Sequence, residues 1–224
     1  MKKITNEEFY RERAKTYPFE DKEALIRYRN AIDWIDFSKE NLVIREVGCK
    51  FSVIRDLLTK ISETVDYIAI DIDEPTLQRI PGYTPEQFIK HNANTGLPFY
   101  DRSVDYLVCL EVMEHLEDAT KFFNETGRVL SNKGRLILSV PNPYCWMECI
   151  GNVMKNEDVE GHISTYTYQN INALSKFCGF NLIDMKGTFT RLPFTNRIFG
   201  EYKLAQTNNI FLSRSFMFLL EKNY

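Results

Sequence analysis

Hydrophobic residues fall into short continuous runs, separated by segments in which apolar residues recur every three or four positions. The second pattern predicts helices at about 52–61, 119–130 and 168–178. The first predicts strands at about 42–47, 67–70, 88–91, 104–110, 135–140, 180–185 and 215–220. Continuous runs are typical of strands buried on both faces, as in a mostly parallel sheet covered by helices.

The alternation of strands and helices predicts a doubly wound α/β fold. Residues 6–39 precede this alternation and are expected to be helical, because apolar positions from Ala24 to Ile35 follow helical spacing. In open α/β sheets, ligands bind beyond the carboxyl ends of the strands. Functional residues are therefore expected just after positions 47, 70, 91, 110 and 140.

Composition narrows the class of protein. The 224 residues include 28 Lys and Arg against 31 Asp and Glu, for a formal charge of −3, and 44% are hydrophobic. These values suit a folded globular chain and exclude a disordered one. The mildly acidic balance also argues against non-specific nucleic-acid binding, which requires an excess of Lys and Arg.

Cysteine use and the absence of long apolar runs predict a cytoplasmic protein without a membrane partner. The five cysteines form no CxxC pair, and no apolar run approaches the length of a membrane-spanning helix. The first residues turn acidic where a signal peptide would turn apolar.

The first two strand ends carry the strongest chemical signal. Gly48 follows the first predicted strand, and Asp71 ends the second, 23 residues later. A tight turn followed by an acid at about this distance is the plan of a nucleoside-binding α/β fold, in which the acid binds ribose hydroxyls. The loop lacks the further glycines that a pyrophosphate requires, so a nucleoside without phosphates fits better.

Five short motifs then occur in order: EVGC (46–49), IDID (70–73), GLPF (96–99), EVMEHL (111–116) and RVLSNKGRLILSVPN (128–142). With this set the chain resembles the class I S-adenosylmethionine-dependent methyltransferases, in their small-molecule branch. The resemblance runs from about Val43 to Met185 and returns in the final strand. It implies a Rossmann-like, mostly parallel seven-stranded sheet with an antiparallel last strand. It also implies S-adenosyl-L-methionine as cofactor and S-adenosyl-L-homocysteine as product.

The resemblance assigns the first cofactor-binding residues by position. Glu46 and Gly48 would face the amino-acid end of the cofactor. Asp71 would bind the ribose hydroxyls, and Ile72 would pack on the adenine.

The next two strand ends complete the cofactor site that the resemblance implies. Asn92 stands where the family usually has an aspartate that reads the adenine amino group, and an amide oxygen can still accept a hydrogen bond. Ala93 would contribute its backbone. Leu110 and Glu111 would close over the methionine portion.

One departure from the family pattern supports an alternative function. The family loop reads GxGxG, and here Lys50 and Ser52 replace the second and third glycines. Glycine serves where the backbone approaches a ligand closely or takes a positive φ. A catalytically degenerate methyltransferase-fold protein, acting in binding or as a scaffold, is therefore kept as an alternative.

Two histidines are the candidate catalytic residues. Transfer of a methyl group to a hydroxyl benefits from a general base, and histidine suits neutral pH. His115 follows the fourth predicted strand and His162 precedes the helix at 168–178, whereas His91 is interpreted as structural. For both candidates, a hydrogen bond that only orders the chain is the alternative. We expect O-methylation of a small metabolite or glycan precursor.

A further alternative involves a metal ion. Spacings of three and four place Glu111, Glu114 and His115 on one face if a helix begins there, and His162 could join them around a divalent cation. The arrangement is similar to that of metal-dependent relatives, the plant small-RNA 2′-O-methyltransferases and some ubiquinone-pathway O-methyltransferases. A metal-assisted RNA 2′-O-methyltransferase is therefore an alternative. The same motif is common in relatives without a metal, so no residue is assigned as a metal ligand.

The chain is expected to form one methyltransferase domain over 1–224. It divides into a helical cap (1–40), a cofactor-binding core (41–187) and a substrate lid with the final strand (188–224). The expected partner is a small-molecule acceptor, and a homodimer is left open.

Overall fold

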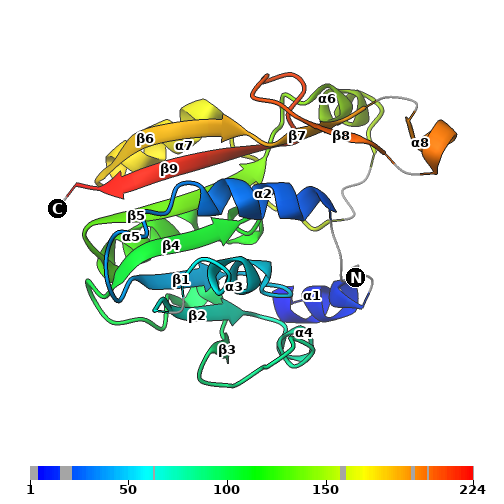
Figure 1. Cartoon of the computed structure of the whole chain (residues 1–224). Coiled ribbons are helices and arrows are strands. Elements are labelled where there is room, and N and C mark those ends of the chain that lie inside the picture. The colour runs from blue at the N-terminus through cyan, green and yellow to red at the C-terminus, as the bar shows by residue number, and fades with distance from the viewer. Residues whose placement is uncertain are drawn as a thin grey trace.

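The structure, a computed structural model, describes residues 5–15, 22–62, 64–156, 160–192, 195–200 and 202–223. Its centre is a seven-stranded sheet in the order β3-β2-β1-β4-β5-β9-β6 (Figure 1). The strands are β1 (Val43–Val47), β2 (Asp66–Asp71), β3 (Phe88–Lys90), β4 (Val104–Leu110), β5 (Leu130–Pro141), β6 (Phe180–Gly187) and β9 (Ser215–Lys222). The final strand, β9, runs antiparallel to both of its neighbours, and the others pair in parallel. The predicted fold is confirmed.

Helices cover both faces of this sheet. On one face lie α2 (Lys22–Ile32), α3 (Val53–Leu58) and α4 (Glu74–Leu77), and on the other lie α5 (Ala119–Val129) and α7 (Tyr168–Phe177) (Figure 1). Strand β4 shows why its apolar run is continuous. Tyr106, Val108 and Leu110 belong to the core beneath α2 and α3, whereas Leu107 and Cys109 belong to the core beneath α5 and α7.

Several elements were not predicted individually. The expected helical region 6–39 contains two helices, α1 (Asn6–Ala14) and α2, and β5 begins at 130 rather than 135. Helices α6 (Trp146–Val153) and α8 (Thr195–Phe199) and a small sheet of β7 (Phe189–Arg191) and β8 (Leu204–Gln206) were missed. These elements are short, so their hydrophobic pattern is too brief to be distinctive.

The carboxyl ends of the central strands meet at one edge of the molecule. Helix α1 lies beside this edge, and α6 and the β7-β8 sheet stand above it (Figure 1). Among the described helices, none combines the length and the apolar character needed to cross a bilayer.

Candidate cofactor and acceptor site

A cavity of about 1210 Å³ opens at the carboxyl ends of the central strands. Residues of α1, α2, α6 and β7 complete its walls. It lies at the edge where the sequence places functional residues and where open α/β sheets bind their ligands.

The loop after β1 keeps a backbone path suited to glycine. Gly48, Lys50 and Ser52 all have positive φ, at 73°, 47° and 55°. A Cβ at Gly48 would overlap the side chain of Val112, so glycine is required there. The two non-glycine residues occupy a left-handed conformation that costs about 1–2 kcal/mol each. The two substitutions have therefore not changed the course of the loop.

Hydrogen bonds hold this loop in place. Ser52 Oγ lies 3.0 Å from the hydroxyl of Tyr67, which donates to the carboxyl of Glu46. The backbone N–H of Lys50 donates to Asp71 Oδ2 at 3.0 Å. The serine thus makes a buried contact that a glycine could not make.

The side chain of Glu46 points away from the cavity. Its side chain is only 1% exposed, and it is absent from the cavity wall. Strand alternation turns it toward Tyr67 and the core beneath α3, while the neighbouring Val47 faces the cavity. Burial raises the pKa of Glu46 to about 8. Glu46 therefore supports the loop from behind the cavity wall.

Asp71 lies in the cavity wall at the end of β2, with Ile72 beside it. Its two carboxylate oxygens accept from the N–H groups of Lys50 and Asp73, each at 3.0 Å. Burial raises the pKa of Asp71, while these donors oppose the shift. The backbone thus fixes the orientation of a carboxylate that can still accept from a sugar diol through its remaining lone pairs.

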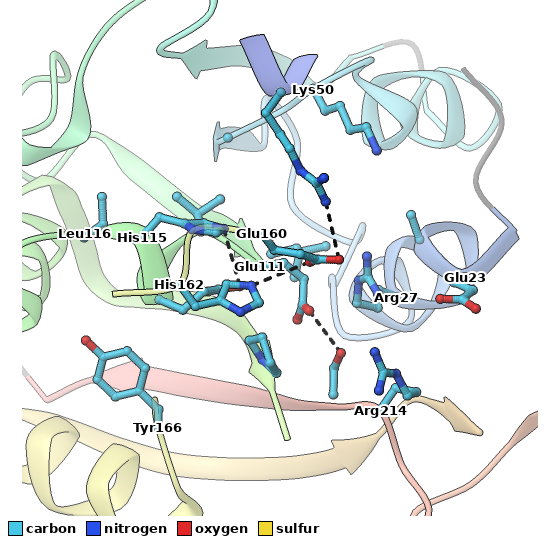
Figure 2. A pocket seen from close by; sticks show the side chains of 18 of the residues that line it. Glu23, Arg27, Lys50, Glu111, His115, Leu116, Glu160, His162, Tyr166 and Arg214 are labelled. Atoms are coloured by element: carbon cyan, nitrogen blue, oxygen red, sulfur yellow. Dashed lines mark hydrogen bonds and ion pairs between the residues drawn. The ribbon is translucent and has the colours of Figure 1, made fainter. Parts of the chain in front are cut away.

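The third and fourth strand ends also reach the cavity. Asn92 and Ala93 line it, and the amide oxygen of Asn92 accepts from the N–H of Asn94 at 3.0 Å, which holds the side chain in place. Leu110 and Glu111 line it too. The carboxylate of Glu111 accepts from the hydroxyls of Ser139 (2.8 Å) and Ser215 (3.1 Å), the latter drawn in Figure 2.

The fold brings the two candidate catalytic histidines together. The ring centroids of His115 and His162 lie 5.0 Å apart, and both residues line the cavity (Figure 2). The backbone carbonyl of Glu114 accepts from the N–H groups of Ile163 and Ser164, which docks the second loop beside the first. Tyr166 lines the same cavity.

A buried carboxylate lies between the two rings. Glu114 Oε1 is 3.9 Å from Nε2 of both His115 and His162, and its side chain is 1% exposed. Neither carboxylate oxygen has a hydrogen-bond partner among the described residues. Burial, with the charge of Glu111 nearby, raises the pKa of Glu114 well above its ordinary value. A buried carboxylate left unpaired in this way points to a ligand in the space beside it.

The environment of His115 favours a neutral ring. Its Nδ1 lies 3.2 Å from the carbonyl oxygen of Gly161, and burial lowers its pKa. The carbonyl can only accept, so Nδ1 carries the proton and Nε2 keeps its lone pair. His91 also reaches the cavity, but its Nε2 contacts the carbonyl oxygen of Gly96 at 2.9 Å. Its interpretation as structural agrees with that contact.

Two ion pairs that the sequence did not predict stabilise the opposite wall of the cavity. Arg191 forms a two-point ion pair with Glu23, and Arg214 pairs with Glu148. Tyr10 of α1 and Arg27 of α2 complete this group of cavity residues (Figure 2 labels Arg27). Ion pairs that join positions 168 and 66 residues apart leave no local signal in the sequence.

Comparisons with known proteins identify the core. Residues 45–138 match the methyltransferase domain family. Over 99 residues the chain is 35% identical to a probable S-adenosylmethionine-dependent methyltransferase of Mycolicibacterium smegmatis, covering 44% of this chain and 38% of that protein. A probable S-adenosylmethionine-dependent methyltransferase of Mycobacterium tuberculosis is 34% identical over 99 residues, covering 44% and 35%. The chain thus spans less than half the length of these curated relatives.

Solved structures share the fold over nearly the whole chain. A chain from a complex of the Haloferax volcanii Trm112 methyltransferase activator with a methyltransferase has a TM-score of 0.70 and 14% identity, with 96% of both chains covered. A Thermotoga maritima S-adenosylmethionine-dependent methyltransferase has a TM-score of 0.67 and 14% identity, with 97% of both chains covered. At this identity the likeness shows the fold alone.

The match over residues 45–138 agrees with the resemblance to the class I S-adenosylmethionine-dependent methyltransferases. The family implies S-adenosylmethionine as the cofactor. The residues present fit this group, because seven of the eight positions carried over from the family line one cavity: Gly48, Asp71, Ile72, Asn92, Ala93, Leu110 and Glu111.

Proposed function

We propose that this chain is an S-adenosylmethionine-dependent methyltransferase that methylates an oxygen of a small metabolite or glycan precursor. One observation carries the proposal: the cofactor-binding positions and the pair His115 and His162 line the same cavity. The expected acceptor is a small molecule, and the expected compartment is the cytoplasm.

In this reaction the chain's own residues bind and orient the reactants and exclude water. The bound cofactor supplies a methyl group already activated by its sulfonium. Asp71 binds and orients the nucleoside, and the loop at Gly48 allows close approach of the backbone. Orientation of two reactants and exclusion of water then lower the barrier.

His115 is the group we assign as general base. Its Nδ1 faces Gly161, which leaves the lone pair of Nε2 available for the proton of an acceptor hydroxyl. The lowered pKa keeps this ring neutral near pH 7. His162, 5.0 Å away, is placed to contact the acceptor.

The test of cofactor binding is calorimetry with S-adenosylhomocysteine. Asp71→Ala should weaken binding at least tenfold, or about 1.4 kcal/mol. Asp101→Ala is a matched control, because Asp101 is exposed and pairs with Arg128 away from the cavity. Unchanged affinity in Asp71→Ala, or no binding to the parent protein, would contradict the proposal.

A second candidate, metal-assisted methylation, is favoured by a specific observation. One ligand atom each from Glu114, His115 and His162 lies within 4.8 Å of the others. Glu111 is outside this group, because Ser139 and Ser215 bind its carboxylate. The fold therefore supports a set of three ligands and not the set of four considered from the sequence.

The chemistry of this set suits a borderline transition metal such as Zn²⁺ or Mn²⁺, because it combines two imidazoles with a carboxylate. A cation there would lower the pKa of an acceptor hydroxyl. The contact between His115 Nδ1 and Gly161 directs Nε2 toward Glu114, as an orienting contact for a metal ligand does. A net charge of −3 gives the RNA acceptor of this alternative no support.

The test is a titration of chelator-treated protein with Mn²⁺ and Zn²⁺. Saturable binding at one equivalent, abolished by Glu114→Gln but retained in Glu117→Gln, would support the candidate. Equal binding to both variants would contradict it. S-adenosylhomocysteine affinity, measured separately, keeps this result independent of the first proposal.

A further inference from the structure

Helix α1 contacts the cavity rim both near Asn92, on the side of the expected cofactor, and at the two histidines, His115 and His162. None of its described side chains belongs to the two hydrophobic cores, and the half-buried Phe9, Tyr10 and Arg13 face the rest of the protein. Figure 1 shows it beside the carboxyl ends of β1 and β2. A helix held in this way adds little to the global core, so its contacts with the site call for a functional explanation.

At one end, α1 is tied to the cofactor side. Glu7 Oε1 lies 2.7 Å from Nζ of Lys90, the last residue of β3. Asn92, two residues further on, lines the cavity. The ion pair is exposed to solvent, so it is expected to add little to stability.

At the other end, α1 meets the two histidines. The ring of Tyr10 packs edge-on against the ring of His115, with centroids 5.2 Å apart and planes at 75°. His115 in turn lies 5.0 Å from His162. The three rings come from three segments far apart in the chain, and the ring of His115 packs against the other two.

The loop that carries His162 also rests on α1. Gly161 has a φ of +81°, and a Cβ there would overlap the ring of Phe9. Arg13 Nη2 lies 3.6 Å from Glu160 Oε1, and the other oxygen of Glu160 lies 3.7 Å from His162 Nε2. Phe9 and Arg13 thus contact the residues directly before His162.

From these contacts we propose that α1 positions the histidine pair: Tyr10 holds the ring of His115, and Phe9 and Arg13 hold the loop of His162. Tyr10 acts through His115 and is a positioning residue, not a catalytic one. The consequence for methyl transfer rests on the proposed function. The positioning itself does not, because it concerns only how the rings are held.

Proton NMR of the histidine rings tests this directly, because the chain has three histidines. Substituting each by glutamine assigns the three Cε1–H signals. At one fixed pH, Tyr10→Ala should shift the His115 signal by removing the ring current of the tyrosine and exposing the imidazole. Tyr10→Phe keeps the ring and should leave that signal near its parent position. The signal of His91, which does not contact α1, should not move in either variant.

Two further variants test the loop contact. Phe9→Ala should shift the His162 signal and leave that of His91 unchanged. Glu12→Ala, on the exposed side of the same helix, should shift neither. Unchanged His115 and His162 signals in both Tyr10→Ala and Phe9→Ala would overturn the inference.

The failure of this inference is distinguishable from that of the proposed function. We expect Tyr10→Ala to bind S-adenosylhomocysteine within about twofold of the parent protein, because the residues that bind it come from other elements. If the parent protein does not bind it, the proposed function fails, and the NMR result still decides the role of α1. If the Tyr10→Ala and Phe9→Ala signals match those of the parent protein while binding is normal, only this inference fails.

Discussion

The two halves of the cavity are built in different ways. In the half expected to bind the cofactor, Gly48, Asp71 and Asn92 lie at strand ends. Backbone N–H groups donate to the side chains of Asp71 and Asn92 and fix their orientation. In the acceptor half, Tyr10, His115 and His162 come from segments far apart along the chain. The first half depends on local turns, and the second depends on how segments far apart in the chain pack against one another.

This difference has a functional consequence. A cofactor shared by a whole family can be bound by strand ends, whose geometry the sheet fixes. An acceptor that differs between relatives is better recognised by loops and added helices, which vary without disturbing the sheet. Substitutions in the two halves should therefore have separable effects.

The largest expected effect is on catalysis. His115→Gln removes the assigned base and should slow methyl transfer by about 10²–10³-fold, within the usual range for loss of a general base. Steady-state rates measured beside S-adenosylhomocysteine calorimetry should show the loss of rate with unchanged binding. His91→Gln is the control. A parallel loss of binding would show that the halves are not separable.

The next effect concerns the cofactor half alone. Gly48→Ala forces a Cβ against Val112 and imposes a strained φ, and the two together should cost about 3 kcal/mol. We expect a loss of S-adenosylhomocysteine binding on the order of 100-fold, with the His115 and His162 NMR signals retained. Gly179→Ala is a matched control, because φ there is also positive, at +81°, but nothing lies within 4 Å of the added Cβ. If Gly48→Ala and Gly179→Ala lose S-adenosylhomocysteine affinity to a similar extent, the positive φ and not the overlap with Val112 causes the loss.

A smaller effect concerns Glu46, which supports the loop after β1 from behind the cavity wall. The folded-state pKa of Glu46, about 8, lies above its ordinary 4.5, so the unfolded chain ionises first as pH rises. The parent protein should therefore lose stability between about pH 4.5 and 8. Glu46→Gln can still accept the Tyr67 hydrogen bond and does not titrate. Its stability relative to the parent should rise across this window by at least about 1.4 kcal/mol, the equivalent of one pKa unit.

Urea unfolding at pH 5 and pH 8 measures this change. Glu117→Gln, an exposed residue, is the control. A stability difference between Glu46→Gln and the parent that stays constant with pH would contradict the assignment of Glu46 as a neutral group in the folded protein.

The smallest expected effects distinguish Lys50 from Ser52, the two residues that replace glycines of the family loop. Lys50→Gly should stabilise the fold by about 1 kcal/mol, because it relieves a left-handed lysine. Ser52→Gly should be near neutral, because relief of strain is offset by loss of the Tyr67 contact. Thermal unfolding of both variants, with S-adenosylhomocysteine calorimetry, gives the result. A large gain of binding in either variant would instead favour the degenerate methyltransferase.

Much of the fold could be predicted from the sequence, and the reason is visible in β4. From Tyr106 to Leu110 its side chains alternate between two cores, so each of these positions is hydrophobic, and a continuous run is the consequence. The turn at Gly48 and the acid at Asp71 were found for a similar reason, because a strand, a turn and an acid at fixed spacing are local features. Short helices such as α6 carry too few residues for the same argument.

The direction of a side chain is harder to predict than its position. Glu46 lies in the motif, yet strand alternation turns it away from the cavity toward Tyr67. Glu111 and Glu114 both follow β4, yet serines bind the first while the second stays buried beside the histidines. Neither outcome can be read from spacing, because each depends on the residues that pack opposite.

The sequence by itself determined the sheet, its order of strands and helices, and the strand ends that form the cofactor half, since these follow from hydrophobic periodicity and turn chemistry. Tertiary structure alone decided that Tyr10, His115 and His162 form one row and that Glu114 lies unpaired between the two histidines. The physical reason is distance along the chain: contacts between segments more than 40 residues apart are selected by packing of the whole fold, and no local pattern records them.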